Sequence, residues 1–209
     1  MIQSTFMQIK KVSAKEIDKV VFIHKASFRN FFLTELGDRF LSVYYSSIQK
    51  SEEGYLLGVY NNNELQGFCA ATQRSSGFNQ RLVKKNLARF LFVGMMILCT
   101  KPGSLIRLGK NFTKKSDAVD DNGDYAELLS IAVGPDKQGL GLGEKLLRAL
   151  EDLLCKDRVK NLSLTTDFYD NKKAILFYGK LGYTIMYEFM AYPKRKMYRM
   201  IKAIASVRQ

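Results

Sequence analysis

The sequence predicts a single α/β (α+β) domain, and three observations support this interpretation. Segments of strand-like composition alternate with segments whose apolar residues recur at helical spacing. Two pairs of strand-like segments, at 53–73 and 183–204, surround polar or proline-containing turns and are typical of β-hairpins. A further strand-like segment, 124–133, runs through three closely spaced glycines into a helix-like segment. The 209 residues suffice for one domain with a hydrophobic core.

Each expected element follows from a local pattern of side chains. After a first strand at 6–12, a helix is expected because four residues fall on one stripe of it: Ile17, Val21, His24 and Phe28. The later elements are expected in this order: a helix at 34–49 broken or begun near Gly37, the 53–73 hairpin, an irregular insertion at about 74–123, the 124–133 strand, a helix at 144–155, a strand at 161–168, a helix at 171–182 and the closing hairpin.

Positive charge is concentrated in two segments of a chain whose formal net charge is +13. Residues 65–116 contain ten Lys and Arg and no acid, and residues 189–209 contain six and no acid. Together they carry +16, so the rest of the chain sums to −3. Localised charge of this kind favours an anionic partner. A solvated cationic surface is the alternative, and the pattern alone does not separate the two.

Three cysteines, Cys69, Cys99 and Cys155, lie far apart and lack the spacing of a metal site. A sparse, odd set is typical of reduced thiols, and the first residues lack the apolar core of a signal peptide. We therefore expect a cytoplasmic protein without a metal cofactor.

Three glycines at alternate positions, in "QGLGLG" at 138–143, join the 124–133 strand to the helix that follows. The N-terminus of a helix carries unpaired N–H groups and the positive end of the helix dipole. A phosphate can bind there when no side chain blocks its approach to the backbone. We expect the glycines to leave the backbone open, with Lys137 and Gln138 adding a charge and a donor. A tight turn without a ligand is the alternative.

Two common phosphate loops do not fit this segment. A Walker loop has lysine and then serine or threonine after its last glycine, whereas Gly143 is followed by Glu144. A dinucleotide-binding loop spaces its glycines as G-x-G-x-x-G near the start of a domain, whereas this loop reads G-x-G-x-G in the second half of the chain.

The same residues resemble a known signature. "QGLGLG" after "AELLSIAV" is similar to the Q/R-x-x-G-x-G/A motif of the GNAT acetyltransferase superfamily, and "NKKAILFYGKLGY" at 171–183 resembles its N-x-x-A-x-x-x-Y-x-x-x-G-F/Y segment. The resemblance is firm over about 124–187, looser over 6–73 and absent from the insertion. It implies one GNAT domain over 1–209: a mixed, mostly antiparallel twisted sheet of six to seven strands flanked by helices, with a basic helical insertion at about 74–123.

The resemblance also implies acetyl-CoA as a co-substrate whose pyrophosphate is held by backbone amides of the glycine loop. Asn171 is expected either to bond the CoA arm or to cap the helix after it. No metal is implied. The implied cofactor-binding residues are Ile131, Ala132, Val133, Gln138, Gly139, Leu140, Gly141, Leu142, Gly143, Asn171 and Tyr178.

Two catalytic residues are implied, because acetyl transfer needs a base for the amine and a proton donor for the departing thiolate. Tyr178 occupies the family's Tyr position and is the expected acid, with a core aromatic role as the alternative. Glu127 lies where some histone-type members place their catalytic Glu, and it is the expected base. An ion pair with Lys or Arg, or the ordering of a water molecule, are its alternatives. Asp167 is a weaker candidate.

The single His24 lies on an apolar helix stripe, so we expect it in the core rather than in catalysis. Cys155 has no histidine near it in the sequence. Direct attack of the amine in a ternary complex is therefore expected instead of a covalent acetyl-cysteine.

The insertion is expected to define the acceptor or partner. Phe90–Cys99 is an apolar run too short to span a bilayer, with Lys84, Lys85 and Arg89 before it and further cations after it. Three interpretations stay open: a core or homodimer helix, a groove for an anionic acceptor such as a nucleotide-linked amino sugar, and a membrane surface that would make the protein peripheral. No recognised nucleic-acid-binding module is found, so nucleic acid is not the expected partner.

Together these features predict an acyl-CoA-dependent N-acetyltransferase that acts on a primary amine of a small molecule or of a protein. Two other functions stay open. One is a CoA-binding regulatory module without catalysis. The other is a membrane-surface or nucleic-acid-binding protein that uses the basic insertion.

Overall fold

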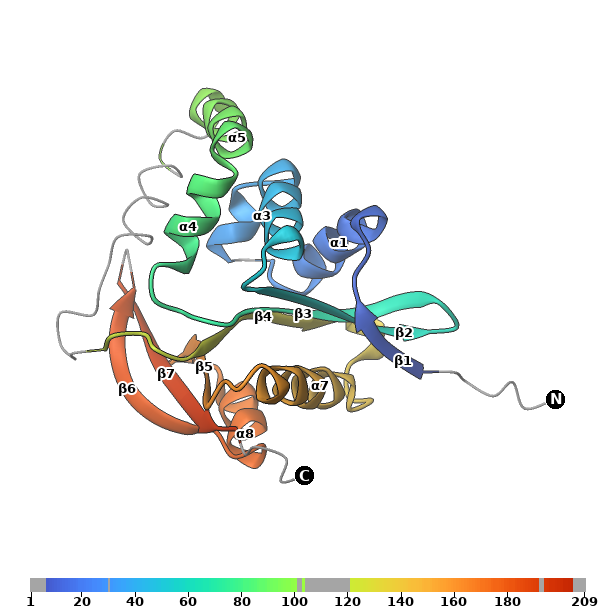
Figure 1. Cartoon of the computed structure of the whole chain (residues 1–209), viewed down its shortest axis with the longest axis vertical. Helices are drawn as coiled ribbons and strands as arrows, with labels where there is room; N and C mark the ends of the chain where they lie inside the picture. Colours follow the sequence, from blue (N-terminus) through green and yellow to red (C-terminus); the bar gives the residue numbers. More distant parts are fainter. Residues whose placement is uncertain (1–6, 30, 101–102, 104–120, 192–193, 205–209) are drawn as a thin grey trace. The chain divides into compact units, whose positions relative to one another are not determined.

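The structure of the chain, a computed structural model, describes residues 7–29, 31–100, 103, 121–191 and 194–204 (Figure 1). Its strands form a seven-stranded sheet in the order β1-β2-β3-β4-β5-β7-β6. The pairing of β4 with β5 is parallel, and the pairs β1–β2, β2–β3, β5–β7 and β6–β7 are antiparallel. The predicted mixed, mostly antiparallel sheet flanked by helices is thus confirmed.

The elements follow the order that the sequence predicts, including the break at Gly37 between α2 and α3 and both hairpins. The strands are β1 (Met7–Lys11), β2 (Gly54–Asn61), β3 (Glu64–Thr72), β4 (Ala126–Val133), β5 (Asn161–Asp167), β6 (Thr184–Ala191) and β7 (Arg195–Ala203). The helices are η1 (Ala14–Glu16), α1 (Ile17–Ser27), α2 (Phe32–Glu35), α3 (Asp38–Lys50), α4 (Phe78–Lys85), α5 (Leu87–Thr100), η2 (Pro135–Lys137), α7 (Leu142–Lys156) and α8 (Lys172–Lys180).

The chain divides into two compact units, and each is described by itself. The first unit is Met1–Thr72 with Leu129–Leu153, and the second unit is Gln73–Leu128 with Leu154–Gln209. That residues 1–209 act as one domain stays a prediction.

In the first unit, β2 pairs antiparallel with β1 and with β3. Asn62 and Asn63 form the turn between β2 and β3 with φ angles of 48° and 63°, which suit the type I′ turn that matches the twist of a hairpin. Helices α1 and α3 contact each other and the β2–β3 hairpin. The side chains that fill this core without any exposed surface include Leu41, Tyr45, Ile48, Val59 and Phe68.

Helix α7 also packs in the first unit, where it fixes the position of the glycine loop before it. Leu146, Leu147 and Leu150 recur at helical spacing and have no exposed surface. The Sγ atom of Cys69, on β3, lies 3.9 Å from the carbonyl oxygen of Leu146. Burial of each such leucine contributes about 1.5–3 kcal/mol, so the start of α7 is held by a well-packed helix.

In the second unit, β5 lies between the start of β4 and β7. Ala126–Leu128 of β4 runs parallel to Leu162–Leu164 of β5, which places Glu127 opposite Ser163. Strand β7 pairs antiparallel with β5, with Arg199 opposite Thr165. These registers bring residues from three separate parts of the sequence to one place in the sheet.

The described part of the insertion forms two consecutive helices, α4 and α5. The helical insertion that the family resemblance implies is thus confirmed for these residues, whereas the irregular segment that the local pattern suggested is not. The side chain of Asn86, between them, donates a hydrogen bond to the Leu82 carbonyl oxygen at 3.0 Å. The apolar run Phe90–Cys99 lies within α5, and residues 104–120 lie outside the described residues. None of the helices in the described ranges is long and apolar enough to cross a membrane.

Candidate functional site

The glycine loop has a backbone that glycine alone adopts without strain at two positions. Gly139 has a φ angle of +81° and Gly141 one of +71°, and α7 begins at the next residue. A Cβ atom added at either glycine would meet nothing within 4 Å. The glycines are therefore required by backbone conformation, and their open surroundings leave the backbone accessible, as the sequence led us to expect.

The first turn of α7 fits an anionic group such as a pyrophosphate. The Lys145 amide donates to the Gly141 carbonyl oxygen at 3.1 Å, which begins the helical bonding. The amides of Leu142, Gly143 and Glu144 precede this bond, so they have no partner within the helix. A helix of 15 residues places the positive end of its dipole here. Open glycines and unpaired amides are what a phosphate requires.

The end of β4, with Ile131, Ala132 and Val133, leads into this loop within the first unit. The carbonyl oxygen of Val133 accepts a hydrogen bond from Ser27 Oγ at 3.2 Å. A Cβ on Gly67 of β3 would lie 2.8 Å from the Ala132 carbonyl oxygen, so β3 approaches β4 very closely here. These contacts hold Ala132 and Val133, two of the three predicted cofactor-binding residues of the strand.

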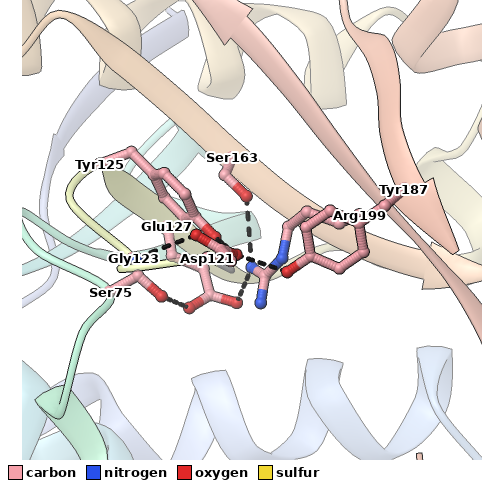
Figure 2. Close-up of polar contacts among 8 residues, drawn as sticks. All are labelled: Ser75, Asp121, Gly123, Tyr125, Glu127, Ser163, Tyr187 and Arg199. Atoms are coloured by element: carbon pink, nitrogen blue, oxygen red, sulfur yellow. Dashed lines mark hydrogen bonds and ion pairs between the residues drawn. The ribbon is translucent and has the colours of Figure 1, made fainter. Parts of the chain in front are cut away.

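In the second unit, Glu127 is the centre of a polar network (Figure 2). Its Oε1 accepts a hydrogen bond from Arg199 Nη1 at 2.7 Å, and its Oε2 accepts one from Ser75 Oγ. Arg199 Nη1 also donates to Ser163 Oγ at 3.2 Å. Only 18% of the Glu127 side chain and 14% of the Arg199 side chain are exposed. Of the alternatives for Glu127, the ion pair with an arginine is present in this structure.

Arg199 is held as a cation in this network. Burial opposes its charge, but the attraction and hydrogen bond of Glu127, together with the hydroxyls of Tyr125 and Tyr187, outweigh burial, and the pKa of Arg199 is raised. Its guanidinium carbon lies 5.6 Å from the centre of the Tyr125 ring and 6.0 Å from that of Phe189. Its Nε is buried and has no hydrogen-bond partner among the residues that the structure describes.

Asp121 adds a second carboxylate to the network. It accepts hydrogen bonds from the Tyr125 and Tyr187 hydroxyls and, at 2.9 Å, from the Gly123 amide (Figure 2). Burial favours its neutral form, but these hydrogen bonds and the charge of Arg199 lower the pKa of Asp121. The network thus contains two carboxylates, Glu127 and Asp121, and one guanidinium, Arg199.

Tyr178 lies on α8, where its ring contacts Phe177 and Tyr183 at centroid distances of 5.1 Å and 5.9 Å. Burial raises the pKa of Tyr178 to about 12, so its hydroxyl stays protonated at neutral pH. Asn171 is positioned as the N-cap of α8 but its side chain does not bond the helix. Instead, its amide donates to Thr166 Oγ1 and, at 3.4 Å, to the Asp167 carbonyl oxygen.

The structure brings some predicted residues into the network and leaves others outside it. Glu127 is within it, whereas the weaker candidate Asp167 forms an ion pair with Arg195. The sequence interpretation missed Arg199, because a positive residue within a closing hairpin carries no sign of a partner 72 residues away. It also missed further members of the network: Ser75, Asp121, Ser163 and Tyr187.

His24 lies in the core, as expected, with 2% of its surface exposed. Its Nδ1 is 2.6 Å from the Tyr45 hydroxyl, which in turn lies 3.0 Å from Ser130 Oγ. Burial lowers the pKa of His24 to about 4. All three cysteines are free thiols. No group of three or more metal-binding side chains occurs in the part of the chain that the structure describes.

The sequence was compared with models of known protein families. The model of the acetyltransferase (GNAT) family matches residues 18–183. The chain therefore belongs to the GNAT acetyltransferase family. The matched span includes the glycine loop, Glu127, Asn171 and Tyr178. Among curated proteins, none matches this sequence.

Solved acetyltransferases share the fold at low sequence identity. The ribosomal-protein-S18-alanine N-acetyltransferase from Escherichia coli is 18% identical with a TM-score of 0.61, covering 98% of this chain and 97% of its own. Ard1 from Thermoplasma volcanium is 16% identical with a TM-score of 0.61, and the match covers 95% of this chain and 98% of Ard1. The PaiA N-acetyltransferase from Thermoplasma acidophilum, in complex with coenzyme A, is 14% identical with a TM-score of 0.53, covering 95% and 99%.

Proposed function

We propose that this protein is a cytoplasmic N-acetyltransferase that transfers the acetyl group of acetyl-CoA to a primary amine by direct attack in a ternary complex. The observation that carries the proposal is the open glycine loop at the start of α7, inside the span that matches the GNAT family. Its backbone geometry suits a pyrophosphate. Membership of the GNAT family supports acetyl-CoA as the cofactor that carries this pyrophosphate.

The residues that would hold CoA are those of the predicted set. The pyrophosphate is assigned to the amides of 138–143, and the pantetheine arm is assigned to the backbone of Ile131–Val133 and to Asn171. The free amide hydrogens at the start of α7 support this assignment. When bound, acetyl-CoA supplies an acetyl group activated as a thioester.

Glu127 is assigned the removal of the proton from the amine, directly or through one water. A primary amine is mostly protonated at neutral pH and is then a cation. The surplus negative charge of Glu127 and Asp121 over Arg199 attracts such a cation. Arg199 and Ser75 are positioning residues, because each holds one oxygen of the Glu127 carboxylate.

Tyr178 is assigned to the departing sulfur. A hydroxyl whose pKa is about 12 is a weaker acid than a thiol, whose pKa is about 8.5. Complete proton transfer to the thiolate would therefore be unfavourable. The role that fits is a hydrogen bond donated to the sulfur while the C–S bond breaks.

The acceptor is proposed to combine an amine with an anionic group. The negative network around Glu127 favours the ammonium form of an amine, whereas residues 189–209 contain six Lys and Arg and no acid. A nucleotide-linked amino sugar has both features. A protein is the other class of acceptor to assay, since the name of the Escherichia coli enzyme states an alanine of a ribosomal protein.

The test is an acetyl-transfer assay with a panel of amino sugars, nucleotide-linked amino sugars, polyamines and peptides. Release of CoA is followed together with the mass of the acetylated product. The proposal requires amine-dependent release that falls at least about a hundredfold in Tyr178→Phe. Release that does not depend on the amine, or that is unchanged in the variant, would overturn it.

A regulatory CoA-binding module is the second candidate. It is favoured by one observation, that both oxygens of Glu127 are already engaged by Arg199 and Ser75. Such a module would bind acetyl-CoA and release none, and Glu127→Gln would leave its binding unchanged. An acetyltransferase and a regulatory module would therefore both bind acetyl-CoA, but only the acetyltransferase would turn it over.

A further inference from the structure

Helix α5 presents an apolar face to solvent that no described element covers. Its exposed large side chains are Leu87, Leu91, Phe92, Met95 and Leu98, with exposed fractions of 50–62%. Isolated exposed apolar residues are ordinary, but a contiguous group of five on one helix marks an interaction surface. We call these five residues the α5 apolar face.

The five residues are contiguous because of their spacing along the helix. Leu87, Leu91, Met95 and Leu98 recur at i, i+4, i+8 and i+11, and Phe92 extends the same side. At about 100° per residue the face covers an arc of about 140° that contains no polar side chain. The opposite side of α5 is the packed one, since Val93 and Ile97 are 4% and 5% exposed.

The segment that carries this face, residues 73–100, contains cations and no carboxylate. Lys84, Lys85 and Arg89 are exposed at the end of α4 and the start of α5, helices that follow each other directly (Figure 1). Residues 73–100 contain five Lys and Arg and no acid. The helix has 14 residues and is about 21 Å long, which is too short to span a bilayer but sufficient to lie along its surface.

We propose that α5 docks its apolar face in the interface of an anionic lipid bilayer, with Lys84, Lys85 and Arg89 attracted to the lipid head groups. Apolar side chains on one side of a short helix, with exposed cations at its start and in the residues just before it, suit this binding mode. The inference goes beyond the proposed acetyl transfer and does not depend on it.

A second copy of the chain is a poorer occupant of the face. Pairing two α5 faces would bring the cations of both copies together, because 73–100 has no carboxylate to compensate them. Like charges at an interface oppose association. An anionic lipid surface instead offers apolar chains for the face and negative charge for the cations.

The test is flotation of the full chain with vesicles of phosphatidylglycerol mixed with phosphatidylcholine, compared with vesicles of phosphatidylcholine alone. Binding is expected only to the anionic vesicles. Lys84→Gln/Lys85→Gln should weaken binding roughly 25-fold, since each lysine at an anionic surface contributes about fivefold. Leu91→Ser/Phe92→Ser should weaken it about tenfold or more.

Two matched variants control for loss of charge or of apolar surface elsewhere. Lys15→Gln/Lys19→Gln removes two exposed lysines of the first unit, and Phe22→Ser removes a side chain that is 74% exposed. Both should bind vesicles as the wild type does. All substituted side chains are exposed, and a thermal melt of each variant verifies that it folds.

A fluorophore provides an independent readout. Cys99 is exposed near the end of α5, and Cys69 is buried, so NBD can be attached to Cys99 in a Cys155→Ser background. Its emission should shift to the blue with anionic vesicles and not with neutral ones, because the dye enters a less polar region.

Three results would overturn the proposal. One is absence of binding to anionic vesicles. Another is binding that Leu91→Ser/Phe92→Ser leaves unchanged, since charge alone would then explain it. The third is a wild-type dimer in sedimentation that the same variant dissociates, which would make the face a self-interface. None of these measurements involves acetyl-CoA, so failure here is distinct from failure of the acetyltransferase proposal.

Discussion

Arg199 Nη1 lies 2.7 Å from Glu127 Oε1, in an ion pair that is largely buried in the second unit. The pair joins β7 to β4 across β5, and Ser163 of the intervening strand contacts the same guanidinium nitrogen. Removing one partner of a buried ion pair leaves the other charge buried without compensation. The loss of one partner is therefore strongly destabilising, even where the intact pair contributes little net stability.

Arg199→Gln is expected to lower the free energy of unfolding by about 3–5 kcal/mol, because the largely buried carboxylate of Glu127 would lose its cationic partner. Urea unfolding measures the change. Lys25→Gln is the control, since the Lys25–Asp38 pair is 43% and 62% exposed and should contribute less than about 1 kcal/mol. If the two variants lowered the free energy of unfolding equally, burial would not explain the contribution of the Arg199–Glu127 pair.

Tyr178→Phe is expected to lower kcat about a hundredfold or more while the free energy of unfolding changes little, because the ring packing is retained and only the hydroxyl is lost. Steady-state transfer to the best amine of the panel checks this. Tyr169→Phe removes the hydroxyl of a tyrosine that is 66% exposed and should leave kcat unchanged. A loss confined to KM would argue that Tyr178 only contributes to binding.

The pH dependence of stability between about 4 and 6.5 should be governed by His24. Its folded pKa is about 4, below the value of about 6.5 for an unfolded histidine. In this window the unfolded chain binds the proton and the folded chain does not, so stability falls as the pH falls. The loss should reach about 3 kcal/mol by pH 4.

This test is clean because the chain contains one histidine. His24→Gln cannot titrate in the window, so its unfolding free energy should vary much less between pH 6.5 and pH 4.5. Chemical denaturation at a series of pH values gives both curves. Parallel curves for the wild type and the variant would show that His24 is not the group responsible.

Gly141→Ala should destabilise the protein by about 1 kcal/mol or more, although nothing lies within 4 Å of the added Cβ, because alanine is strained at a φ of +71°. Gly94→Ala is the matched control. It also has open space, but it lies within α5 without a positive φ, so it should stabilise by about 0.5–1 kcal/mol. Opposite signs are the expected result of paired thermal melts.

The sequence predicted most of the fold because its local signals agree with one another. The asparagines at 61–63, the break at Gly37 and the leucines of α7 each specify a structure within a few residues. The same holds for the glycine loop, whose residues are consecutive. These features can be predicted without knowledge of what packs against them.

The network around Glu127 could not be predicted in the same way. Arg199 reaches Glu127 only through the strand registers of β4, β5 and β7, which join distant segments, and Ser75 comes from beyond the end of β3. The sequence interpretation explained the glycines only by the need to leave the backbone open to a phosphate. The positive φ angles at 139 and 141, which also require glycine, are a property of the folded loop. In the insertion, the division into α4 and α5 at Asn86 depends on packing that composition does not specify.

The most direct test of the central proposal is the melting temperature of the wild type, Gly141→Asn and Gly141→Asp with and without acetyl-CoA. Asparagine and aspartate both tolerate a positive φ, and only aspartate adds a negative charge at the expected pyrophosphate site. At a hundredfold excess over the dissociation constant, the ligand should stabilise the wild type by about 2.7 kcal/mol. A shift that is largest in the wild type, smaller in Gly141→Asn and absent in Gly141→Asp is the predicted result. Equal shifts in all three proteins, or no shift in the wild type, would contradict a CoA site at the start of α7.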